Sequence, residues 1–75
     1  MKIRARYDYA AKTGLISISN IINNKPVSFS LKLFDEATGS LLKINKSVFP
    51  SIDEAISYAT LYGFLAHMWE VEILN

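Results

Sequence analysis

Side chains that commonly carry catalysis or bind metal ions are few in this sequence. His67 is the only histidine and there is no cysteine, so a conventional zinc site would need several carboxylates as well. No serine stands in a nucleophile motif around His67. We therefore interpret His67 as part of the connection between a helix and a strand.

Two pairs of carboxylates have the residue types that general acid and base catalysis uses. Asp53 and Glu54 stand at the start of a predicted helix, where the helix dipole favours negative charge. Glu70 and Glu72 alternate with apolar residues, as on the solvated face of a strand. The three glycines are isolated and do not form a phosphate-binding loop. The sequence therefore predicts no enzyme activity, no catalytic residue, no metal ligand and no cofactor.

Lys2, Arg4 and Arg6 form a basic stripe at the start of the chain. They alternate with apolar residues, so they share one face of a predicted strand. Such a stripe could follow the phosphates of a nucleic acid. The aromatic platform of sheet-based RNA-binding proteins is missing, because Tyr7 and Tyr9 belong to the opposite face of the same strand. Nucleic-acid binding is therefore an alternative and not the main prediction.

Two other roles for this basic stripe follow from the distribution of charge. Residues 1–34 carry six basic residues and one acidic residue, whereas residues 35–75 carry two basic and six acidic residues. If the first and last strands are neighbours, the arginines would face Glu70 and Glu72, and the charges would cancel locally. If they are not neighbours, the stripe is free to meet an acidic protein.

The second candidate surface is a stripe of apolar residues on the helix, formed by Tyr58, Leu61 and Leu65. It lies beside the stripe that faces the core, and a surface helix needs only one apolar face. Exposed apolar side chains of this kind are typical of the centre of protein interfaces. The alternative is that residues 21–26 or the last strand cover the stripe. If it is exposed, it can bind a foreign protein or form a homodimer.

One helix positions this stripe, and both of its ends are marked in the sequence. Ser51 and Glu54 have the spacing of a capping box, which predicts that the helix begins after Ser51. Gly63 is predicted to end the helix in a left-handed conformation, with Phe64 folding back onto the last turn. The residues expected to face the core are Ile52, Ala55, Ile56, Ala59 and Tyr62.

Alternation of apolar and polar residues predicts the strands. In the last of them, Trp69, Val71 and Ile73 are expected to point toward the core. Turns are expected where glycine, asparagine or proline interrupts the alternation. The strands are expected at residues 2–9, 15–20, 27–34, 40–46 and 69–74. The turns are expected at residues 10–14 (signalled by Thr13-Gly14), 23–26 and 35–39 (closed by Gly39).

The predicted fold class is α+β, with a single small two-layer domain over residues 1–75. An antiparallel sheet of four to five strands, in the chain order β-β-β-β-α-β, would carry one helix on one face. The chain has 75 residues, of which 51% are hydrophobic, which is enough for one core. No apolar run approaches the roughly 18 residues of a membrane span, and the N-terminus does not resemble a secretion signal. We therefore expect a cytoplasmic protein without a membrane partner.

These features favour a small protein that binds another protein and has no turnover of its own. An inhibitor or accessory factor encoded by a phage or mobile element, and directed at a host complex, fits this description. Its predicted binding residues are Tyr58, Leu61, Leu65, Lys2, Arg4 and Arg6. A nucleic-acid-binding protein and a homodimer are the alternatives.

Overall fold

The computed structural model describes residues 2–74, which form one antiparallel sheet and one α-helix. The sheet has the order β4-β3-β2-β1-β6, and β5 also pairs with β3. The predicted α+β fold, with the helix before the last strand, is confirmed. The strands are β1 (Lys2–Tyr9), β2 (Lys12–Ile22), β3 (Lys25–Asp35), β4 (Ser40–Leu41), β5 (Val48–Phe49) and β6 (Trp69–Leu74). The helical segments are α1 (Ile52–Ala59) and the short 3₁₀ helices η1 (Thr60–Tyr62) and η2 (Ala66–Met68).

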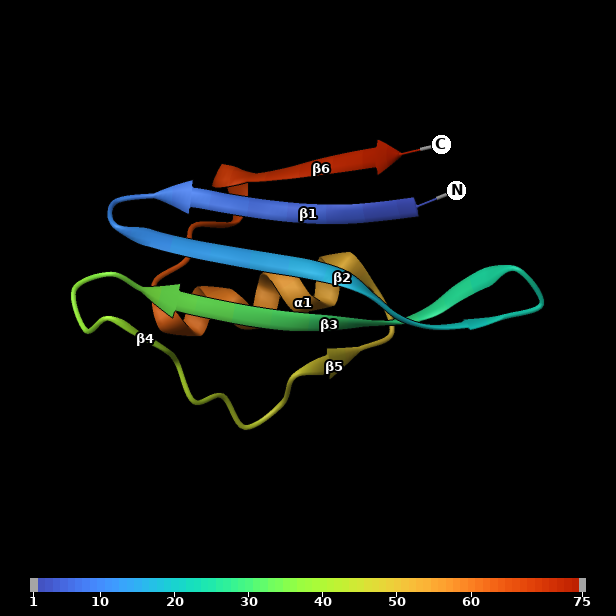
Figure 1. The fold of residues 1–75 in the computed structure, drawn as a ribbon, viewed down its shortest axis with the longest axis horizontal. Coiled ribbons are helices and arrows are strands. Elements are labelled where there is room, and N and C mark those ends of the chain that lie inside the picture. The colour runs from blue at the N-terminus through green and yellow to red at the C-terminus, as the bar shows by residue number, and fades with distance from the viewer. Residues whose placement is uncertain (1, 75) are drawn as a thin grey trace.

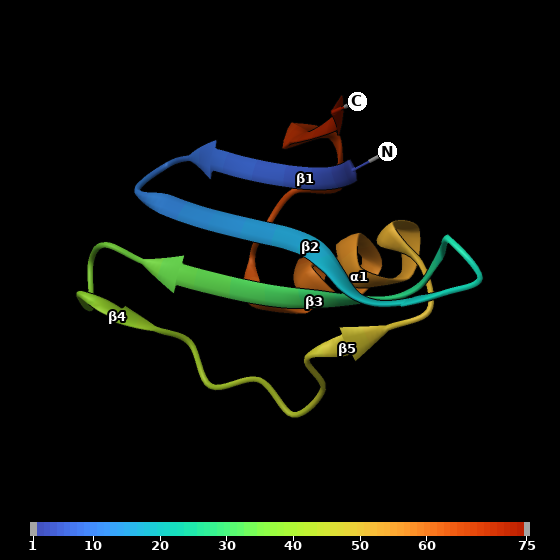
Figure 2. The same cartoon turned by 45° about the vertical axis from the view of Figure 1, so that its right-hand side comes forward.

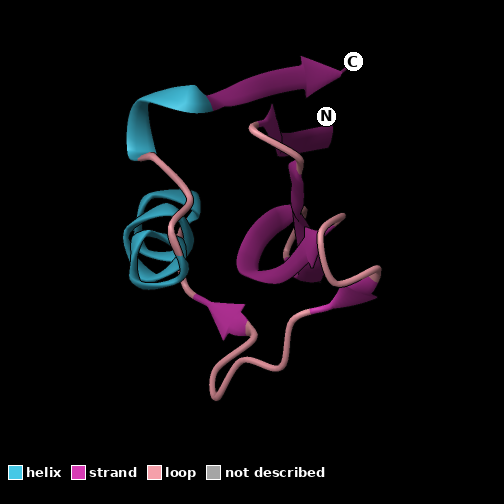
Figure 3. Ribbon diagram, turned by 90° about the vertical axis from the view of Figure 1, so that its left-hand side faces the viewer, coloured by secondary structure: helices cyan, strands magenta, loops and turns pink. Residues whose placement is uncertain are grey.

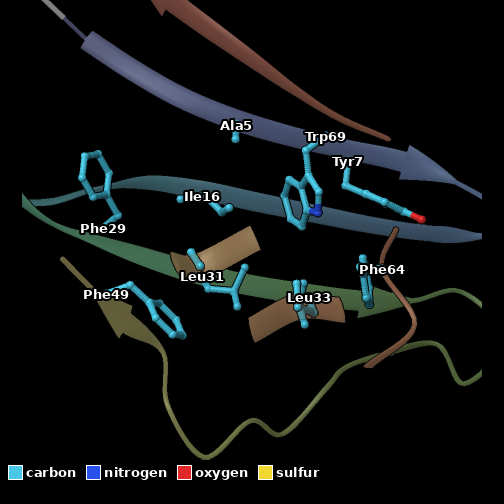
Figure 4. Close-up of a cluster of buried hydrophobic side chains, with 11 residues drawn as sticks. Ala5, Tyr7, Ile16, Phe29, Leu31, Leu33, Phe49, Phe64 and Trp69 are labelled. Atoms are coloured by element: carbon cyan, nitrogen blue, oxygen red, sulfur yellow. The ribbon is translucent and has the colours of Figure 1, made fainter. Parts of the chain in front are cut away.

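The core lies between the helix and the middle of the sheet. In Figure 1 the helix α1 runs behind β2 and β3, and Figure 3 shows the two layers from the side. The sheet contributes the buried side chains of Ile16, Leu31 and Leu33, which Figure 4 shows. The helix residues predicted to face the core all pack in it or against it: Ile52, Ala55, Ile56, Ala59 and Tyr62.

The α-helix is shorter than predicted, because α1 stops at Ala59 and the 3₁₀ helix η1 forms the last turn before Gly63. The predicted start and the left-handed Gly63 are both confirmed. At its start, Ser51 Oγ accepts a hydrogen bond from the Glu54 backbone N–H at 3.1 Å, and the Ser51 hydroxyl lies 3.4 Å from the Glu54 carboxylate. At its end, Gly63 has a φ of 86°, and the Phe64 N–H donates to the Ala59 carbonyl at 3.3 Å. This is the bonding of a Schellman motif, so the chain reverses at Gly63 and directs Phe64 into the core.

The first turn lies within the predicted residues 10–14 but is shorter than predicted. Ala10 and Ala11 form the turn, with φ values of 54° and 62°, and β2 already begins at Lys12. Two positive φ values in a two-residue loop are typical of a type I′ turn, which Asn-Gly favours and alanine does not. Thr13 and Gly14, which carry the turn signal of this segment, lie in β2 instead.

Gly14 lies inside β2 for a packing reason. It pairs with Tyr7 of β1, and Tyr7 pairs with Trp69 of β6 on its other side. A Cβ atom added at Gly14 would lie 2.5 Å from Trp69 Cη2, which is far inside van der Waals contact. The indole therefore occupies the space that a side chain at Gly14 would need.

Replacing the Ala10-Ala11 turn by Asn-Gly is expected to stabilise the protein. Left-handed backbone costs a residue with a Cβ atom about 1–2 kcal/mol, a cost that glycine does not carry. We expect Ala10→Asn with Ala11→Gly to raise the free energy of unfolding by about 1–2 kcal/mol in urea denaturation. Ala37→Gly is the matched control, because Ala37 is exposed in a turn without a positive φ, and it should bring no gain. A less stable double variant would contradict the prediction.

The predicted strand at residues 40–46 is present only in part. β4 covers Ser40–Leu41, and after an irregular segment the chain returns to β3 as β5. Leu42 and Ile44 in this segment still pack against the core. An irregular segment can bury two alternate side chains as well as a strand can. The alternation of apolar and polar residues therefore did not distinguish the two structures. The turn before β4 agrees with the prediction, since Gly39 has a φ of 67°.

The far end of the β2–β3 hairpin projects beyond the helix, as Figure 1 and Figure 2 show. Its turn is Asn23-Asn24, both with positive φ, which confirms the turn predicted there. The pairing register shifts on both sides of Asn20, and such bulges increase strand twist. Ile21 and Ile22 lie beyond the shift and are exposed.

Candidate functional site

The predicted basic stripe lies next to the last strand. β1 pairs antiparallel with β6, which places Arg4 opposite Glu72. Arg4 donates to Glu72 Oε2 from Nε at 3.2 Å and from Nη2 at 3.0 Å. Arg6 Nη1 lies 3.5 Å from Glu72 Oε1. Both arginines therefore bind one carboxylate, which is the cross-strand pairing that the sequence offered as one alternative.

The open face of the sheet also carries a shallow hollow of about 310 Å³. Its apolar part is formed by Leu15, Phe34 and Leu41, and both leucines are exposed. Arg6 and Lys32 stand at its border. The hollow opens widely to solvent, so it is a contact surface and not an enclosed substrate pocket.

The predicted helix stripe is divided among three segments. Tyr58 in α1 packs against Phe49, with ring centroids 5.2 Å apart, and its hydroxyl lies 3.3 Å from that of Tyr62. This hydrogen bond raises the pKa of the Tyr62 hydroxyl above its ordinary value. Leu61 in η1 is 75% exposed, and Leu65 is exposed just before η2. Tyr58 therefore contributes to packing, while Leu61 and Leu65 are exposed but do not share one helix face with it.

One helix cannot cover this sheet, and the uncovered part includes most of β6. An α-helix with its side chains is about 10 Å wide and strands are about 4.8 Å apart, so it shields about two strands. Trp69 at the start of β6 is buried against Phe64. Val71 and Ile73 lie on the same face but are 53% and 61% exposed. Their predicted direction is correct, but no core lies over them in the described structure.

Val71 borders a groove between the sheet and the start of the helix. The groove has a volume of about 310 Å³, and its apolar lining consists of Ile3, Phe29, Ile52 and Val71. Ile73 pairs with Ile3 and extends this apolar surface along β6. We refer to Ile3, Ile52, Val71 and Ile73 as the β6 strip.

β6 is also the edge strand of the sheet. No strand within residues 2–74 pairs with its outer side, so alternate backbone N–H and C=O groups there lack a strand partner. The opposite edge is formed by β4 and β5, which have only two residues each. β6 has six residues and carries Glu70 and Glu72 on its open face. It therefore offers backbone hydrogen bonds, apolar side chains on one face and carboxylates on the other.

The residues considered for catalysis are dispersed. His67 is exposed in η2, and Asp53 and Glu54 occupy the first turn of α1. In the part of the chain that the structure describes, no three His, Cys, Asp or Glu side chains are grouped so that they could hold a metal ion. Among residues 2–74, no helix has both the length and the apolar composition of a membrane span. The lack of enzyme activity stays a prediction.

Sequence reasoning placed the binding surface on β1 and the helix and missed the β6 strip. Val71 and Ile73 alternate with glutamates in the way that residues of a half-buried strand do. No residue of β6 signals that the strand lies at an edge. The usable signal was the ratio of one predicted helix to four or five strands, because such a helix leaves part of the sheet uncovered.

Comparison of the chain with protein-family models, curated proteins and solved structures finds no match.

Proposed function

We infer that this protein is a non-enzymatic protein-binding module that binds its partner through the β6 strip and the outer edge of β6. The observation that carries this proposal is the exposure of Val71 and Ile73 on an edge strand with no partner strand in the described chain. Addition of a strand to such an edge is a common mode of protein recognition. Main-chain hydrogen bonds supply affinity, and alternate side chains supply specificity.

The shape of β6 distinguishes it from a protected edge. Natural edge strands are often very short, bulged, covered or charged, which prevents unwanted pairing; β6 carries two glutamates but is neither very short nor bulged. β4 and β5 at the other edge are short in this way. β6 pairs with β1 in continuous register from Lys2↔Leu74 to Tyr7↔Trp69, and its apolar side chains adjoin a groove. A partner strand would find both a regular backbone and an apolar surface beside it.

A nucleic-acid partner fits the structure less well. Arg4 and Arg6 would have to exchange their contacts with Glu72 for contacts with phosphates. Phe34 pairs with Thr13 on one side and Leu41 on the other, so it does not form a platform with a second aromatic ring on a neighbouring strand. Proteins bind single-stranded nucleic acids mainly by stacking on the bases and by neutralising the phosphates. This surface offers little for either interaction.

Binding without turnover is how small inhibitors and accessory factors act, and we propose that the protein is such a factor, of phage or mobile-element type, directed at a host complex. The second candidate is a homodimer, which is favoured by the exposure of Leu61 and Leu65 away from the β6 strip. A dimer through these leucines would leave the edge of β6 free.

Site-specific photo-crosslinking tests where the partner binds. A photoreactive amino acid at Ile73 of the full chain, activated in lysate of the source cells, is expected to yield a defined adduct with another protein. The same residue at Ser57, exposed on α1, is the matched control and should yield none. An adduct of two copies from Leu61 would support the homodimer instead. Absence of a defined adduct from Ile73 would overturn the proposed function.

A further inference from the structure

The side chains on the two faces of β6 describe the partner more closely, and this inference rests on the proposed function. We propose that the outer edge of β6 accepts an extended protein segment in which basic residues alternate with apolar residues. The basic residues would lie on the open face of the sheet beside Glu70 and Glu72. The apolar residues would lie on the helix side beside Val71 and Ile73.

β1 shows which pattern β6 already accepts on its inner side. Glu72 faces Arg4 there, and Val71 faces Ala5. Side chains of a strand stand roughly perpendicular to the sheet, so each one flanks both neighbouring strands. A strand on the outer side would therefore meet the same carboxylates and the same apolar side chains that β1 meets. The matching sequence is again basic and apolar in alternation.

Glu70 determines the sign of charge that fits best. It pairs with Arg6 in register, but Arg6 reaches Glu72 instead, and Glu70 forms no ion pair within residues 2–74. A residue on an outer strand would have its Cβ about 5 Å from that of Glu70. The guanidinium groups of Arg4 and Arg6 lie 3.0 and 3.5 Å from the Glu72 carboxylate, so they offset the charge of Glu72, whereas Glu70 has no such partner. Glu70 therefore decides, and it favours a basic side chain.

The same charges disfavour a second copy of β6 as the occupant. An antiparallel pair of β6 strands that shares its apolar face would place Val71 opposite Val71 or Ile73 of the copy. Glu72 would then lie opposite Glu70 or Glu72 of the copy. Like charges directly opposite each other destabilise a pair of strands. Charge complementarity thus selects a different, basic segment.

Two synthetic peptides test this inference on the full chain. The first has the sequence of residues 2–8, which contains the basic and apolar alternation, and the second has glutamate in place of its three basic residues. Binding is followed by NMR hydrogen exchange of the β6 amides. We expect the basic peptide to protect the outward-pointing amides of β6 and to bind about tenfold more tightly than the acidic peptide. Glu70→Lys should reverse this preference, whereas Glu36→Lys, at an exposed site in the turn between β3 and β4, should not.

The outcomes separate this inference from the proposed function. Equal binding of both peptides would overturn the charge preference and leave strand addition at β6 intact. Loss of protection between β1 and β6 would show that the peptide replaces β1, which would contradict binding at the outer edge. If neither peptide protects β6, the inference is wrong, while crosslinking from Ile73 still decides the proposed function independently.

Discussion

Replacing Phe64 by alanine is expected to lower the free energy of unfolding by about 3–5 kcal/mol. The side chain is fully buried, and its ring centroid lies 4.9 Å from that of Tyr7 and 6.3 Å from that of Trp69. It closes the core where the chain leaves the helix, so its loss would leave a cavity that the neighbouring rings cannot fill. Small domains have total stabilities of about 5–15 kcal/mol, so most of the stability would be lost. Urea unfolding followed by the fluorescence of Trp69 measures the effect.

Leu61→Ala is the matched control for Phe64→Ala. Leu61 lies only three residues earlier but is 75% exposed, so its truncation should change the stability by less than about 0.5 kcal/mol. A similar loss in both variants would show that Leu61 is part of the core. An unchanged unfolding midpoint for Phe64→Ala would contradict the packing described for the end of the helix.

The second large effect is expected for Gly14→Val, which should cost about 2–3 kcal/mol by overpacking. The Cβ atom would lie 2.5 Å from Trp69 Cη2. The indole cannot simply turn away, because its ring centroid lies 5.2 Å from that of Tyr7 and the residue is held in β6. Thermal unfolding followed by circular dichroism measures the loss.

A double-mutant cycle with Trp69→Phe identifies the cause of that loss. The smaller ring leaves room at Gly14, so the two substitutions together should cost at least about 0.5 kcal/mol less than the sum of the single effects. Strict additivity would show that Gly14→Val acts through the strand backbone and not through the indole.

Features that depend on a few neighbouring residues could be predicted from the sequence. The capping pair Ser51 and Glu54 and the left-handed Gly63 define both ends of the helix, because these hydrogen bonds are local. The alternation in β1 predicted which of its side chains face the core, and Ala5 and Tyr7 are buried, whereas Tyr9 at the end of the strand is 47% exposed. The fold class follows from the order of these elements.

Prediction from neighbouring residues failed where the conformation of a residue depends on contacts with residues far away in the sequence. Gly14 resembles a turn residue, yet it lies in a strand because the ring of Trp69 occupies its side-chain space. Ala10 and Ala11 carry no turn signal, yet they form the turn because the pairing of β1 with β2 imposes positive φ values on them. These choices depend on packing and on strand register, which neighbouring residues in the sequence do not encode.

The division between sequence and tertiary structure is clearest in the last strand. The sequence alone determined that Val71 and Ile73 share one face and that Glu70 and Glu72 share the other, because side chains of a strand alternate. It also supplied the arginines that could pair with the glutamates. Only the tertiary structure decided that β6 lies at the edge beside β1, that both arginines bind Glu72, and that Val71 and Ile73 are exposed. The physical reason is that burial depends on what lies over a face, and one helix covers only about two strands.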